Sequence, residues 1–142
     1  MGLSELLLEE EHFALKTQKD FAEKQAVAKE AVKLVRDGAV VVLDAGGHVI
    51  AAAREDGASP GRFAIAQGKA YGAVMLGMAG TAQRDRAEAQ AYFMAAANGI
   101  YAGKLAPVPG GILVRDKRGR VVGAVGVTGD TSENDLAAGL GI

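Results

Sequence analysis

The sequence predicts an α+β domain in which helices pack on a mainly antiparallel sheet. Two runs rich in β-branched residues, at 39–53 and 112–127, are each interrupted by a short turn. Such hairpins join neighbouring antiparallel strands without a crossover helix. The segments before, between and after the hairpins have helical composition or spacing. We therefore expect the order α, ββ, αα, ββ, α within a single domain that covers residues 1–142.

Composition limits the classes of partner. The chain of 142 residues carries a net charge of −1, so nothing in it favours nucleic acid or an anionic membrane. It has no cysteine, which excludes disulfides and thiolate metal sites and is compatible with a reducing compartment. The start of the chain has no basic segment typical of a signal peptide. We expect a cytoplasmic protein.

The first expected helix covers residues 3–36, which contain no proline and no glycine. Its second part places Phe21, Ala28 and Val35 at helical spacing with charged residues opposite. We interpret residues 1–19 as an N-terminal helical arm, and we expect Asp37-Gly38 to end the helix because glycine fits the position just past a helix end.

The two hairpins resemble each other. Ala39–Leu43 and His48–Ala53 are the expected strands of the first, and the second turns at residues 116–119. The pattern Asp44-x-x-Gly47-His48-Val49-Ile50-x-Ala52 matches Asp116-x-x-Gly119-Arg120-Val121-Val122-x-Ala124. Because there is no third copy, we interpret this weak repeat as two similar hairpins of one sheet.

Two helices are expected between the hairpins, at about Arg62–Met78 and Arg86–Asn98, and a last one at Thr131–Leu140. Residues 63–83 carry a single charge, Lys69, and are long enough to raise the question of a membrane span. The central lysine and the glycines in this run favour a buried helix of a soluble protein instead. Small residues at a spacing of four (Ala64, Gly68, Gly72) allow close packing inside the subunit or at a subunit interface.

Lys69 is the most isolated charge of the sequence. Its ammonium could point into a pocket and meet a substrate carboxylate, or act there with a lowered pKa. Alternatively, Lys69 marks the solvated edge of its helix, with its stem along apolar surface and its head in water.

Other polar residues offer further candidates. Arg54 and Asp56 lie in a loop between the first hairpin and the apolar helix. They could line the mouth of a pocket, where an arginine binds a carboxylate, or they could be solvated like most polar loop residues. His12 is a candidate haem iron ligand, since imidazole commonly fills this role, although most single helix histidines are not ligands. His48 closes a tight turn and is expected to be exposed.

The end of the second hairpin suits an anion. Gly123, Gly126 and Gly129 lead into Thr131, a good helix N-cap residue. Backbone N–H groups that converge at a helix start favour a carboxylate or phosphate. The acids that follow explain part of this pattern as helix capping and partly oppose a bound anion. The spacing GxxGxxG, after a hairpin strand, does not fit a dinucleotide-binding fingerprint.

Taken in order, several motifs resemble the GlcG/HbpS family of haem-binding proteins over about residues 20–142. They are Val41-Val42-Leu43-Asp44-Ala45-Gly46-Gly47-His48-Val49, Arg54-Glu55-Asp56-Gly57, Ala66-x-x-Lys69-Ala70-x-x-Ala73, Pro109-Gly110-Gly111, and Val122 to Asp135. The resemblance implies a profilin-like α+β domain that assembles into homo-oligomers, with haem as a candidate cofactor. A related domain is fused to corrinoid adenosyltransferases. Iron ligands differ among members, so none is carried over by motif.

These observations lead to three hypotheses. The first is a homo-oligomeric binding protein whose pocket, between the apolar helix and the second hairpin, takes haem or a smaller acidic ligand. Its expected ligand-binding residues are Arg54, Lys69, Gly110, Gly111, Gly126, Thr128, Gly129 and Thr131. The second is an enzyme for proton transfer or hydration on a small organic acid, with Lys69, Asp56 and Asp135 as catalytic groups. The third is a purely structural role in assembly.

Overall fold

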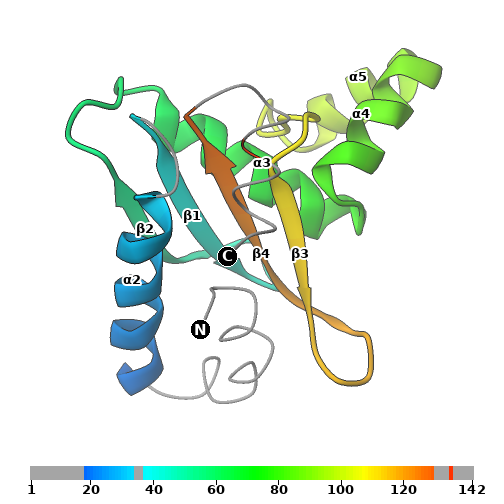
Figure 1. The fold of residues 1–142 in the computed structure, drawn as a ribbon. Coiled ribbons are helices and arrows are strands. Elements are labelled where there is room, and N and C mark those ends of the chain that lie inside the picture. The colour runs from blue at the N-terminus through cyan, green and yellow to red at the C-terminus, as the bar shows by residue number, and fades with distance from the viewer. Residues whose placement is uncertain (1–17, 34–36, 130–134, 136–142) are drawn as a thin grey trace.

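The protein is an α+β domain built in three layers, as the sequence predicted. The computed structural model describes residues 18–33, 37–129 and 135. One helix covers one face of the sheet, a second helix covers the other, and two shorter helices lie beyond the second (Figure 1). The described elements are α2 (Gln18–Val32), β1 (Ala39–Asp44), β2 (Val49–Arg54), α3 (Arg62–Leu76), α4 (Gly80–Ala89), α5 (Ala91–Ile100), β3 (Gly111–Arg115) and β4 (Val121–Thr128).

The described strands form one antiparallel sheet in the order β2-β1-β4-β3. The inner strand β1 is apolar from Ala39 to Leu43 because both of its faces are covered there. Val40 and Val42 face α2, where they pack with Ala28 and Val32. The alternate residues of β1 face α3, where they pack with helix residues; this second cluster consists of Ala39, Val41, Leu43, Ala66, Ala70, Ala73 and Ala124.

The two hairpins share their turn geometry. Asp44 accepts hydrogen bonds through Oδ1 from the backbone of Gly46 and His48, and Asp116 does the same for Arg118 and Arg120. Each turn then has a glycine with positive φ at the same place, and each hairpin has a register shift just after it. The aligned sequence patterns therefore correspond to matching local structures.

Helix α3 lies unusually close to β4, and glycine makes this possible. A Cβ built on Gly126 would lie 1.9 Å from the backbone oxygen of Ala66, and one on Gly111 would lie 2.3 Å from that of Lys69. No side chain fits at such distances. The two glycines thus allow the helix backbone to rest directly on the sheet.

The region between the hairpins differs in one respect from the prediction. Instead of one helix at Arg86–Asn98, the chain forms α4 and α5 with a break at Gln90, whose backbone is not helical (φ −141°, ψ 67°). No glycine or proline marks this break, so helix propensity did not reveal it. The guanidinium of Arg86 in α4 lies 4.1 Å from the ring centroid of Phe93 in α5, and this contact spans the bend.

The two ends of the chain lie largely outside the described residues. The helical arm predicted at residues 1–19 lies outside the described residues except for its last two positions, which begin α2. Of the last predicted helix, only Asp135 is described, and its backbone is helical. Within the described part of the chain, no helix combines the length and apolar character needed to span a membrane.

Candidate functional site

Lys69 is buried and already has an anionic partner. Only 2% of its side chain is exposed, and its ammonium donates to the backbone oxygen of Val127 and to Oδ2 of Asp135, both at 3.0 Å. Asp135 is equally buried, with 1% of its side chain exposed. Lys69 therefore lies at the glycine-rich end of the last strand, as the sequence suggested, but the acid it meets belongs to the same chain. It does not mark a solvated helix edge.

Of the predicted glycines, Gly110 lies against the ammonium of this ion pair, whereas Gly111 and Gly126 lie against the backbone of α3. A Cβ on Gly110 would lie 2.9 Å from the ammonium of Lys69, and the positive φ of Gly110 (117°) independently favours glycine. Gly110 also accepts a backbone hydrogen bond from Val127. Gly110, Gly111 and Gly126 thus have a packing role around Lys69, and a ligand-binding role for them stays a prediction.

The remaining predicted residues are spread around this end of the sheet. Thr128 is buried, and its hydroxyl accepts a weak hydrogen bond from Arg62 at 3.5 Å. Arg54 and Asp56 are exposed, and β1 separates Arg54 from Thr128 in the sheet. Gly129 follows β4 with φ 154°. His12 and Thr131 lie outside the described residues.

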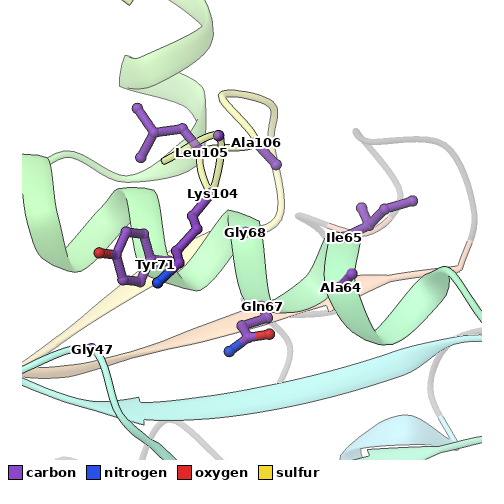
Figure 2. A pocket seen from close by; sticks show the side chains of 10 residues that line it. Gly47, Ala64, Ile65, Gln67, Gly68, Tyr71, Lys104, Leu105 and Ala106 are labelled. Carbon is purple, nitrogen blue, oxygen red and sulfur yellow. The ribbon is translucent and has the colours of Figure 1, made fainter. Parts of the chain in front are cut away.

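A hollow of about 430 Å³ lies beside α3, away from the Lys69–Asp135 pair. Its walls come from α3, from the turn of the first hairpin and from the loop after α5, as Figure 2 shows. The size falls in the range of about 300–1,000 Å³ that small-molecule sites occupy. The lining residues are Gly47, Ala64, Ile65, Gln67, Gly68, Tyr71, Gly103, Lys104, Leu105 and Ala106.

One cation and one aromatic ring give the hollow its chemical character. The ammonium of Lys104 lies 5.5 Å from the ring centroid of Tyr71, and both side chains are seen together in Figure 2. The ring of Tyr101 meets that of Tyr71 edge-on, with 6.0 Å between centroids. The ammonium therefore lies over a face of the Tyr71 ring, in a cation–π arrangement that holds the cation at the wall of the hollow.

Two hydrogen bonds fix the outer wall. The backbone N–H of Ala106 donates to the oxygen of Gly68 at 3.3 Å, and that of Leu105 donates to Oδ1 of Asn98 at 3.0 Å. A Cβ on Gly68 would lie 3.1 Å from the Cβ of Ala106. Gly68 and Gly72 of the small-residue stripe of α3 are therefore used for internal packing, one of the two alternatives that the sequence left open, whereas Ala64 is exposed.

Neither Lys104 nor Tyr71 was singled out from the sequence. One feature of the sequence could have drawn attention to Lys104: it is the single Lys or Arg of residues 87–114. Its meaning depends on a long-range contact with α3, which spacing along the chain does not reveal. The hollow thus shares α3 with the pocket predicted from the sequence but lies at a different side of the helix, and the predicted pocket stays a prediction.

The residues around the hollow fit a planar ligand with an acid group. Apolar side chains and the Tyr71 ring suit a flat apolar body, and Lys104 suits a carboxylate. The phenol oxygen of Tyr71 belongs to a residue type that ligates haem iron in known proteins. Among the described residues, no group of three or more His, Asp or Glu side chains is arranged to hold a metal ion.

These features define a small α+β domain with a ligand-sized hollow on one side of its central helix. The chain belongs to the family of haem-degrading HbpS-like proteins, whose family model matches residues 20–140. No curated protein matches the chain by sequence.

Solved structures share the fold. Crystalline HbpS has a TM-score of 0.69 at 24% identity, with 87% of this chain and 85% of that chain covered. The heme complex of PduOC has a TM-score of 0.71 at 22% identity, with 87% of this chain and 89% of that chain covered. ORFY of Klebsiella pneumoniae has a TM-score of 0.66 at 25% identity, with 87% and 86% covered. The family match confirms the predicted family, and these structural similarities confirm the predicted fold class.

Proposed function

We propose that the protein binds haem, or a related planar ligand that carries a carboxylate, against α3 in the hollow beside Lys104. The observation that carries this proposal is the pairing of a flat aromatic surface with a single cation inside a hollow of ligand size. Membership of a haem-degrading family and a structural relative solved as a heme complex support the choice of ligand.

Three kinds of wall residue have a role in this proposal: the cation, the aromatic ring and the apolar side chains. The ammonium of Lys104 would bind a propionate. Tyr71 would contact the ligand either through its ring face, packed on the flat body, or through its phenol oxygen as an iron ligand, and the Tyr71→Phe variant separates these two roles. Bound haem supplies a redox-active iron. Alanines and leucine of the walls exclude water from the apolar part of the ligand.

Hemin titration followed by the Soret band tests the proposal. The wild-type protein should shift the band with saturation at one hemin per chain. Lys104→Met should weaken binding about tenfold, because one charge-assisted contact is lost. Tyr71→Phe should change the position of the band if the phenol ligates iron. Lys33→Met removes an exposed cation on the other face of the sheet and serves as the matched control.

The pocket predicted between the apolar helix and the second hairpin remains the alternative location. It uses Lys69, whose ammonium would have to exchange Asp135 for the ligand's acid group. If a folded Lys69→Met variant lost hemin binding while Lys104→Met kept it, the site would lie there. Self-assembly and a cytoplasmic location belong to the same proposal.

A further inference from the structure

The hollow beside Lys104 has three lining residues with polar side chains, namely Gln67, Tyr71 and Lys104. Among the described residues that line it, none is acidic. Within the part of the chain that the structure describes, the Gln67 amide and the Lys104 ammonium form no hydrogen bond or ion pair. Both groups are therefore available to a ligand.

Two other glutamines of the chain use their amides inside the fold. The side chain of Gln25 forms hydrogen bonds with both the backbone N–H and the backbone oxygen of Ala52. Nε2 of Gln83 donates to the backbone oxygen of Met78 at 2.8 Å. Gln67 is half-buried on α3 and lines the hollow without such a partner. Because partly buried polar groups are normally hydrogen-bonded, this amide is a candidate for a contact with the ligand.

The position of Gln67 on α3 places it close to the cation. Gln67 and Tyr71 are four residues apart, so they are neighbours on one face of the helix, with about 5–6 Å between their Cβ atoms. The ammonium of Lys104 lies 5.5 Å from the centroid of the Tyr71 ring. Figure 2 shows the side chains of Gln67, Tyr71 and Lys104 on one side of the hollow, with Ile65 on the other. The hollow thus has a polar side and an apolar side.

We propose that Gln67 and Lys104 hold the two oxygens of one ligand carboxylate, and that Gln67 thereby sets the preference of the hollow for a free acid. A lysine ammonium is a compact charge that binds one carboxylate oxygen well. The second oxygen then needs a donor of its own, because an unpaired polar atom is costly once water is excluded. The amide of Gln67 supplies two N–H donors and adds no charge.

This arrangement discriminates against flat ligands that lack an acid group. Such a ligand covers the Lys104 ammonium and the Gln67 amide, and leaves both without a partner. A site built to hydrogen-bond a polar group rejects an analogue without that group. The hollow should therefore prefer hemin to ferric etioporphyrin, an iron porphyrin with alkyl groups in place of both propionates. The inference rests on the proposed function and adds a specificity-determining residue to it.

Titrations of the same variants with hemin and with ferric etioporphyrin test the inference. Gln67→Leu keeps most of the side-chain volume but removes the donors. It should weaken hemin binding about tenfold and leave the affinity for ferric etioporphyrin unchanged. Gln67→Asn keeps the donors but withdraws them by one methylene, and should lose less. Gln90→Leu removes a half-buried amide that does not line the hollow, and serves as the matched control.

A double variant tests whether the two groups share one carboxylate. If they do, their effects on hemin binding are coupled, because loss of one contact releases the acid group from the other. Gln67→Leu should then weaken hemin binding less than about threefold when Lys104→Met is already present. Two losses that simply multiply would overturn the inference, since the two residues would then contact different groups of the ligand.

The outcomes separate this inference from the proposed function. If the wild type binds hemin and Lys104→Met weakens binding while Gln67→Leu does not, the inference is wrong and the proposed function stands. If Gln67→Leu weakens the binding of hemin and ferric etioporphyrin equally, Gln67 acts through packing, and the inference is again wrong. A wild type that binds neither compound would overturn the proposed function, and this inference with it.

Discussion

Lys69 and Asp135 bring opposite charges together where almost no water reaches them. Removing two charges from water costs several kcal/mol per ion, and their attraction offsets this cost only when both partners are present. The second hydrogen bond, to the Val127 oxygen, uses another donor of the same ammonium. The pair therefore ties α3, the end of β4 and the position of Asp135 together.

Loss of one partner should be costly. Lys69→Met leaves the Asp135 carboxylate buried without its cation, and we expect the free energy of unfolding to fall by about 3–5 kcal/mol. The double variant Lys69→Met/Asp135→Leu removes both charges and should recover most of that loss. Urea unfolding measures both. A single variant as stable as the wild type would show that the pair is not buried in solution.

The turn of the second hairpin makes a pH-dependent contribution. Partial desolvation acts to raise the pKa of Asp116, but hydrogen bonds from Arg120 and Arg118, with the Arg120 charge, outweigh it and hold the pKa below its usual value. A carboxyl group with a lowered pKa stabilises the fold fully above the pKa of the unfolded chain. That stabilisation is lost as the pH falls through the lowered, folded-state pKa.

Asp116→Asn should therefore destabilise the protein at neutral pH, and the difference from the wild type should shrink as the pH is lowered through the acid range. Thermal melting at a series of pH values measures this difference. Asp56→Asn, in an exposed loop, controls for the loss of one negative charge. A difference in melting temperature between Asp116→Asn and wild type that stays constant down to the lowest pH would contradict the lowered pKa of Asp116.

At the scale of elements, the contact between α3 and β4 depends on glycine. Gly126→Ala would force a methyl group against the Ala66 backbone oxygen, and backbone cannot move aside as a flexible side chain can. We expect a loss of about 3 kcal/mol or more in the free energy of unfolding.

Gly61 provides the matched control for this substitution. Nothing lies within 4 Å of a Cβ built on it, and its φ of −74° suits alanine. Gly61→Ala should leave the stability unchanged or raise it by as much as about 1 kcal/mol, because alanine restricts the unfolded chain. Equal effects at Gly61 and Gly126 would mean that α3 does not rest on β4 as described.

The elements show what local sequence can reveal. Strand pairs, turns and the apolar helix were predictable because their signals are local: β-branched runs, Asp and Gly in turns, and a stretch with one charge. The break at Gln90 was not predictable, since no glycine or proline marks it; the contact between Arg86 and Phe93 that spans it is seen only in the structure. The partner of Lys69 and the hollow at Lys104 also depend on residues distant in sequence.

At the scale of the whole molecule, the two matching hairpins form the sheet, and one helix covers each of its faces. Because α3 covers the sheet with one side only, its outer side is free to form the hollow with the loop after α5. The sheet and α2 then support the site proposed on α3, and α5 lies at the edge of the domain (Figure 1).

Paramagnetic broadening of amide NMR signals by ferric hemin tests the central claim most directly, because it reports both binding and its location. The account predicts that broadening centres on residues 64–71 and 103–106, and that signals of Ala28 to Val32 on the other face of the sheet stay sharp. Broadening centred instead on Gly110, Val127 and Asp135 would place the ligand at the buried ion pair. Absence of any specific broadening would contradict haem binding by this chain.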